Sequence, residues 1–229
     1  MRQNPSFVLS EIAEIKRLIR ENPWVTMVSS TDTVLIASHY PVILDESADD
    51  IVLLSHVGRP DERLHELGSH ELLVIVQGPH GYISPCWYDA KPAVPTWNFV
   101  TAHLYGTPEI LTDAENLVVL DTLVDHFEDR MPEPRRMNGT LENAAYAARI
   151  VSGTVGFRMR VDRFVAKNKM SQNKALETVD RIIGELEGDG PYASASLAAE
   201  MRRVHGGNAG ARATVSSSDT TVSSSPCIV

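Results

Sequence analysis

Residues 25–57 read VTMVSSTDTVLIASHYPVILDESADDIVLLSHV, a segment in which short apolar, β-branched runs alternate with pieces rich in Asp, Ser and Thr. The pattern continues to residue 104, and the apolar runs cover residues 25–30, 34–44, 51–57, 71–82 and 94–104. Short strands separated by turn-forming residues are typical of antiparallel barrels. This part of the chain therefore predicts an α+β protein built around a closed antiparallel β-barrel.

Helical periodicity flanks the predicted barrel. Residues 11–22 carry apolar side chains at helical spacing, with Ser10 as a suitable N-cap and Pro23 at the end of the run. Thr112 is a suitable N-cap for a longer helix over residues 113–131. Further helices are predicted at residues 60–67, 141–150, 174–187 and 194–204, and a single strand at residues 154–165.

The chain is acidic, with 21 Lys and Arg against 30 Asp and Glu and a formal net charge of −9. Nucleic-acid binding draws much of its affinity from neutralised phosphates, so we expect no nucleic-acid partner. No run approaches the roughly 20 apolar residues of a membrane helix, and the N-terminus lacks the apolar region of a signal peptide. We therefore expect a cytoplasmic protein without membrane contact.

Length and composition predict one folded domain over residues 1–205 of the 229-residue chain. Residues 206–229 are rich in Gly, Ala, Ser and Thr, can bury little apolar surface, and are predicted to be disordered. The two cysteines, Cys86 and Cys227, are too few for a disulfide framework or a cysteine zinc cluster.

Two motifs are unusually dense in aromatic residues, His, Pro and Gly: QGPHGYISPCWY (77–88) and VPTWNFVTAHLYG (94–106). Four more accompany them: SHYPVILD (38–45), SHVGR (55–59), VGFRMRVDR (155–163) and KNKMSQNK (167–174). On these motifs the chain resembles the PaiB-type family of FMN-binding proteins over residues 10–200. The resemblance implies a split β-barrel similar to flavin reductases and pyridoxamine-phosphate oxidases, and a homodimer with the cofactor between subunits.

Proteins that resemble this family include FMN-binding negative transcriptional regulators and haem proteins that act as piperazate synthases. Three departures favour the haem branch here. The opening residues MRQNPSF differ from the usual pattern, the Asn-Pro and Trp that usually follow the barrel histidine are absent after His56, and an imidazole is gained at His65. We therefore expect a haem b enzyme that converts N5-hydroxy-L-ornithine, an amino acid, to piperazate through an N–N bond. The alternatives are an FMN-binding PaiB-like negative transcriptional regulator and another flavin-type oxidoreductase.

The resemblance directs attention to two histidines as iron ligands. Haem iron takes a neutral imidazole or a thiolate as axial ligand, held on a stiff element. His65, on the short helix predicted at residues 60–67, is the first candidate ligand, and His56 is the second because it matches the family at large. The plain structural alternatives are a solvent-facing histidine at position 65 and a hydrogen-bonded strand-end histidine at position 56.

Five other residues complete the predicted site. Arg59 suits a substrate carboxylate because its guanidinium binds in a bidentate fork, and with Lys167 it is a candidate catalytic residue. Lys167 and Lys169 also suit haem propionates or, in the flavin alternative, the FMN phosphate. Trp97 and Gln172 are expected to contact the cofactor. The alternatives are solvated lysines and aromatic side chains that serve only core and dimer contacts.

Overall fold

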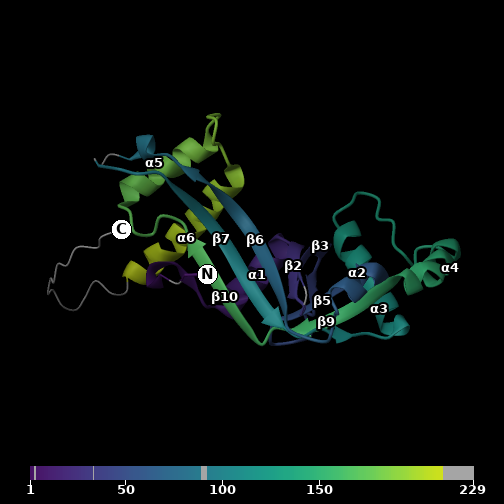
Figure 1. Ribbon diagram of the computed structural model, residues 1–229. Helices are drawn as coiled ribbons and strands as arrows, with labels where there is room; N and C mark the ends of the chain where they lie inside the picture. The colour runs from purple at the N-terminus through teal and green to yellow at the C-terminus, as the bar shows by residue number, and fades with distance from the viewer. Residues whose placement is uncertain (3, 33, 89–91, 214–229) are drawn as a thin grey trace. The chain divides into compact units, whose positions relative to one another are not determined.

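A computed structural model describes residues 1–2, 4–32, 34–88 and 92–213, with side chains up to residue 206 (Figure 1). The chain divides into two compact units, the first formed by residues 1–78 and 99–169 and the second by residues 79–98 and the chain from residue 170 on. The strands are β1 (Val8–Leu9), β2 (Trp24–Ser30), β3 (Leu35–Pro41), β4 (Ile43–Leu44), β5 (Val52–Gly58), β6 (Leu72–Ile83), β7 (Thr96–Gly106), β8 (Glu109–Ile110), β9 (Thr154–Arg160) and β10 (Arg163–Lys169). The helices are η1 (Pro5–Phe7), α1 (Ile12–Glu21), α2 (Arg59–Leu64), η2 (Pro85–Trp87), α3 (Asp113–Glu128), α4 (Leu141–Ile150), η3 (Val151–Gly153), α5 (Leu176–Glu187) and α6 (Ala195–Ala213).

The strands form two sheets. The larger has the order β1-β10-β7-β6-β2-β3 and the smaller has the order β4-β5-β9-β8. Figure 1 shows β10, β7 and β6 side by side, and β10 pairs with β7 in antiparallel register. In β7, Asn98, Val100, Ala102 and Leu104 are buried while the residues between them are more exposed. This period of two is the alternation expected of a half-buried strand, and it confirms the strand predicted there.

Two of the predicted strands are wrong, because each divides into two shorter strands that belong to different sheets. Residues 34–44 form β3 in the larger sheet and β4 in the smaller, with a break at the buried Val42, whose N–H donates to the Pro23 carbonyl at 2.8 Å. Residues 154–165 likewise divide into β9 and β10, with a break at Val161 and Asp162. In each case the chain passes directly from one sheet to the other. Periodicity alone did not separate the two strands, although Pro41 precedes the first break and Asp162 lies in the second.

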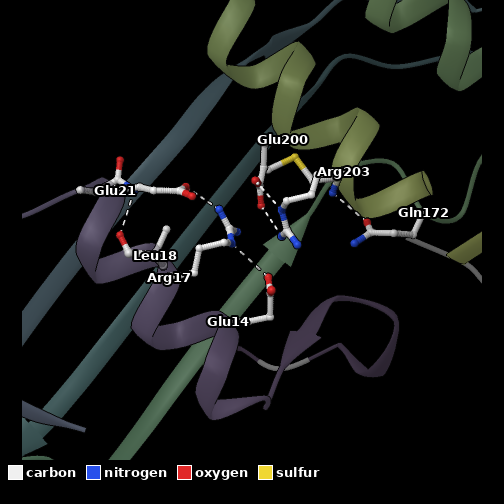
Figure 2. Close-up of polar contacts among 9 residues, drawn as sticks. Glu14, Arg17, Leu18, Glu21, Gln172, Glu200 and Arg203 are labelled. Carbon is white, nitrogen blue, oxygen red and sulfur yellow. Dashed lines mark hydrogen bonds and ion pairs between the residues drawn. The ribbon is translucent and has the colours of Figure 1, made fainter. Parts of the chain in front are cut away.

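The predicted helices form, with one incorrect cap. Helix α1 begins after Glu11, not after Ser10, and its N-cap makes no side-chain hydrogen bond. Its apolar stripe is buried as expected, while Arg17 on the same helix lies with its guanidinium between two carboxylates, those of Glu14 and Glu21 (Figure 2). Among the residues that the structure describes, no helix has both the length and the apolarity to cross a membrane.

Helix α3 covers the smaller sheet. Thr112 caps it as predicted, in a capping box with Glu115. Val119 and Leu123 of the helix form a buried cluster with Ile43 of β4. On β9, a Cβ atom added at Gly156 would lie 2.6 Å from Asn116 Oδ1 of the helix, so only glycine permits this close approach.

The second unit is centred on α5 and α6, which pack together through their buried faces. Glu200 is almost fully buried on α6 and accepts two hydrogen bonds from Arg203, at 2.8 and 3.0 Å (Figure 2). Helix α6 continues to Ala213, beyond the boundary predicted at residue 205. The remainder of the predicted disordered tail, residues 214–229 with Cys227, lies outside the described residues. A single domain over residues 1–205 stays a prediction.

Candidate functional site

His65 is held by serine hydroxyls on both sides of its ring. It follows the last residue of α2, is only 1% exposed, and has Nδ1 at 2.8 Å from Ser29 Oγ of β2. Its Nε2 lies 3.0 Å from Ser38 Oγ of β3. Burial lowers the pKa of His65, so the ring is neutral and donates one of these hydrogen bonds while accepting the other. His65 therefore connects the short helix to two strands of the larger sheet.

A second set of contacts ties α2 to β3 and β5. Tyr40 of β3 donates from its hydroxyl to Asp61 Oδ2 at 2.7 Å and accepts from the Gly58 N–H at 3.2 Å. Burial raises the pKa of Tyr40, and the bond to Asp61 raises it further. Tyr40 and Ser38 are two residues apart on one strand, so they lie on the same face of it. The contacts of Tyr40 and those of His65 therefore meet on one face of β3.

His56 differs from the other residues of this region because one of its ring nitrogens has no hydrogen-bond partner among the described residues. It lies on β5, where its ring meets the Tyr40 ring edge-on at 6.3 Å between centroids. Its Nδ1 is buried and, among the described residues, has no hydrogen-bond partner. Burial lowers the pKa of His56 and favours the neutral ring. A buried polar atom without a partner costs stability, so this nitrogen is a candidate for contact with a bound group. We call Ser29, Ser38, Tyr40, His56, Asp61 and His65 the His56–His65 network.

Arg59, at the start of α2, donates hydrogen bonds to two backbone carbonyls. Its Nε donates to the Ser152 carbonyl at 2.8 Å and its Nη2 to the Thr154 carbonyl at 3.3 Å. The guanidinium also lies 3.9 Å from Asp113. A clamp for a substrate carboxylate would have to give up these bonds, because the same N–H groups are needed for both. Catalysis by Arg59 stays a prediction.

Lys167 and Lys169 share one face of β10, since they are two residues apart on the strand. The Lys167 ammonium lies 5.6 Å from the centroid of the Phe99 ring and 5.8 Å from that of the Phe7 ring. Phe99 is also the register partner of Lys169 on β7. This face therefore presents two cations around a flat aromatic ring, a combination that suits a phosphate next to a planar group.

The remaining predicted residues belong to the second unit. Trp97 is 54% exposed and stacks on His80, with 6.5 Å between centroids, while Tyr82 meets it edge-on. Gln172 accepts from the Met170 N–H at 2.7 Å in the turn that follows β10. The structure thus joins His56 and His65 in one network, places Lys167 and Lys169 together, and assigns Trp97 and Gln172 to a separate unit. Contact of Trp97 and Gln172 with a cofactor stays a prediction.

Ser29, Ser38, Tyr40 and Asp61 were missed by the sequence reasoning. Ser38 and Tyr40 lie inside the motif SHYPVILD (38–45), so the family resemblance did mark their segment. Ser29 and Asp61 carry no such signal. Within the described part of the chain, no group of three or more His, Cys, Asp or Glu side chains could hold a metal ion by itself.

Comparison with known proteins identifies the fold and the relatives. Residues 1–163 match the family model described as "Putative FMN-binding domain". The chain is 29% identical over 185 residues to protease synthase and sporulation protein PAI 2 of Bacillus subtilis, across 80% of this chain and 87% of that protein.

Solved structures of other proteins share this fold. The FAD and heme binding protein of Mycobacterium smegmatis aligns with a TM-score of 0.54 at 19% identity, across 75% of this chain and 78% of that one. The flavocytochrome Anf3 of Azotobacter vinelandii aligns with a TM-score of 0.55 at 12% identity, across 74% and 72% of the two chains. At these identities the likeness concerns the fold alone, and it confirms the predicted α+β split barrel.

Proposed function

Because the chain belongs to the PaiB-like family of FMN-binding domains, we propose that it binds FMN and uses it in the conversion of a small molecule. The observation that carries the proposal is the family match over residues 1–163, which includes the whole His56–His65 network. Bound FMN supplies hydride or electron transfer. This proposal takes the place of the haem enzyme that the sequence departures favoured.

The residues of the first unit fit such a cofactor. FMN carries a phosphate and a planar ring system, and the β10 face offers Lys167 and Lys169 next to the Phe99 ring. In the proposal the two ammonium groups neutralise the phosphate, since paired cations are the usual partners of that group. The unpaired Nδ1 of His56 offers a hydrogen bond to a bound group, and the Tyr40 ring holds the imidazole edge-on.

A haem protein of the piperazate-synthase kind is the second candidate, with a changed ligand. His65, the first choice from sequence, has both ring nitrogens within hydrogen-bond distance of serine hydroxyls, so a bond to iron would displace one of them. His56 offers a neutral imidazole with an unpaired nitrogen, which is what haem iron requires of a histidine. This nitrogen is the specific observation that favours the second candidate.

The test is a cofactor competition on the purified full chain. The protein is incubated with excess FMN or with hemin, freed of unbound cofactor by gel filtration, and examined by absorbance. We expect flavin bands to be retained, and Lys167→Ala to weaken FMN binding about tenfold through loss of a charged phosphate contact. Arg130→Ala removes an exposed positive charge of the same unit and is the control.

The two candidates give opposite results in this experiment. A protein that retains hemin with a Soret band and releases FMN would overturn the flavin proposal, and the band should then disappear in His56→Ala. A protein that retains neither cofactor would overturn both.

We further propose that the protein is a homodimer that acts on a small molecule. Trp24 and Leu35 are 65% and 70% exposed at opposite ends of the antiparallel β2–β3 pair, where Trp24 lies opposite Pro41 and Leu35 opposite Ser30. Val34, next to Leu35, is 53% exposed, and adjacent exposed apolar side chains favour contact with another chain. Light scattering should give twice the 25.2 kDa of one chain, and a monomer at all concentrations would contradict the proposal.

The net charge of −9 does not favour the regulatory function, because it disfavours contact with DNA.

A further inference from the structure

A groove lies between α3 and the smaller sheet, and it shares no residue with the His56–His65 network. Its volume is about 270 Å³, close to the lower end of small-ligand sites. The apolar lining includes Leu54 of β5, Leu111, and Val119 of α3. Carboxylates from three different elements complete it: Asp45, Glu109 and Glu115.

The apolar floor is fixed by the core beneath it. Val119 is 5% exposed and belongs to the buried cluster with Ile43 and Leu123. Leu54 and Leu111 are only partly buried and pack against this cluster. The floor therefore keeps its shape while leaving apolar surface open to the groove, where a hydrocarbon group would be removed from water.

The rim carries more negative than positive charge. Among the described residues that line the groove, Arg158 is the one cation, and its Nη2 lies 3.2 Å from Asp45 Oδ2. Glu115 is ionised, because the hydrogen bond from the Thr112 hydroxyl at 2.7 Å lowers its pKa. Glu109 lies opposite Arg158 in the β8–β9 register and makes no ion pair with any described residue. Three carboxylates face one guanidinium, so the described residues give the groove a surplus of negative charge.

We propose that this groove binds an organic cation, a small molecule with an ammonium group on an apolar carbon skeleton. The skeleton lies on Leu54, Leu111 and Val119, and the ammonium lies at the rim next to Glu109. An anion is disfavoured because Arg158, the only cation that the described residues place at the rim, already pairs with Asp45. A bare metal ion is disfavoured as well, because the described His, Cys, Asp and Glu side chains form no cluster that could hold one.

The test uses n-hexylammonium chloride as the probe and the full chain as the protein. Amide chemical shifts are followed by NMR at low salt, with n-hexanoate and 1-hexanol as probes of the same chain length and different charge. We expect saturable shifts for hexylammonium confined to the segments that line the groove, which are β5, β8, β9, α3 and the turn at residues 45–47. Hexanoate should cause none, and hexanol should bind at least about threefold more weakly, as the loss of an exposed charge contact implies.

Two variants with matched controls locate the site. Glu109→Gln should weaken hexylammonium binding about threefold, whereas Asp121→Asn, on α3 but outside the groove, should not change it. Val118→Lys places a cation on the groove wall and should weaken binding more than Glu109→Gln does. Its control is Leu141→Lys on α4, where the side chain is 93% exposed.

The proposal is overturned by any of three results. These are equal binding of hexanol, stronger binding of hexanoate, or shifts that do not saturate. Circular dichroism of each variant checks the fold, which we expect to be retained because all four positions are on the surface or partly exposed.

Discussion

His56 and His65 lie in the same network and differ in what their ring nitrogens contact. His65 is 1% exposed and has a serine hydroxyl within hydrogen-bond distance of each nitrogen. His56 has a buried Nδ1 for which the described residues provide no partner. A histidine with both nitrogens satisfied stabilises the fold, whereas one with an unsatisfied nitrogen is costly unless something else binds it. These contacts favour a structural role for His65, and they are the basis for the ligand-binding role that we propose for His56.

The largest effect that this comparison predicts is on stability at His65. His65→Leu removes two hydrogen bonds and leaves the Ser29 hydroxyl buried without a partner. We expect the free energy of unfolding to fall by about 2–4 kcal/mol, measured by urea denaturation. His56→Leu is the matched variant and should change stability by less than about 1 kcal/mol, because it removes an unsatisfied nitrogen. Equal losses in the two variants would remove the distinction between the histidines.

The two serines should differ from each other in the same assay. Ser29 is 1% exposed, so Ser29→Ala leaves His65 Nδ1 without a partner where water has little access, and should cost about 1–3 kcal/mol. Ser38 is only partly buried, so in Ser38→Ala water replaces the hydroxyl and the cost should stay below about 1 kcal/mol. A larger loss for Ser38→Ala would show that Nε2, and not Nδ1, holds the ring.

FMN affinity should depend on His56 and not on the contacts of His65, which is the reverse of the order expected for stability. His56→Leu should weaken FMN binding about tenfold by removing one hydrogen bond to the bound group, measured by fluorescence titration. Ser38→Ala, which acts only on His65, should leave the affinity within about twofold of wild type. If Ser38→Ala weakens binding as much as His56→Leu does, the network binds the cofactor as a unit.

Much of the fold could be predicted from local sequence pattern, and the exceptions share a cause. The alternation in β7 and the cap at Thr112 are local properties, so they were predictable. The breaks at Val42 and at Val161 depend on which sheet receives the next strand, a choice made by residues distant in the chain. The breaks are only one or two residues long, at Val42 and at Val161–Asp162, so single-sequence periodicity does not detect the change of sheet.

The candidate site was predictable only as a set of residue types. The motif around His56 marked one important residue, and the departure at position 65 marked another. Their contacts were not predictable, because Ser29 is separated from His65 by 36 residues and Ser38 by 27. Spacing in the sequence does not say whether an imidazole will meet hydroxyl groups or open space. The role proposed for His65 from sequence therefore differs from the one its contacts support.

The smallest expected effect is on the pH dependence of stability. Burial lowers the pKa of both His56 and His65 below the 6.5 of an exposed histidine. Below pH 6.5 the unfolded chain binds protons that the folded chain does not, so the free energy of unfolding should decrease as the pH falls. Each histidine contributes at most about 1.4 kcal/mol per pH unit to this slope. Denaturation midpoints between pH 5 and pH 8 measure it.

Single replacements separate the two contributions. Both His65→Leu and His56→Leu should reduce the slope, and the slope that remains in the double variant belongs to other groups such as His103, whose pKa burial also lowers. Added FMN should change the midpoint's dependence on pH through His56 and not through His65, because both nitrogens of His65 already have a serine hydroxyl within hydrogen-bond distance. A ligand effect that persists in His56→Leu and is lost in His65→Leu would reverse the roles of the two histidines.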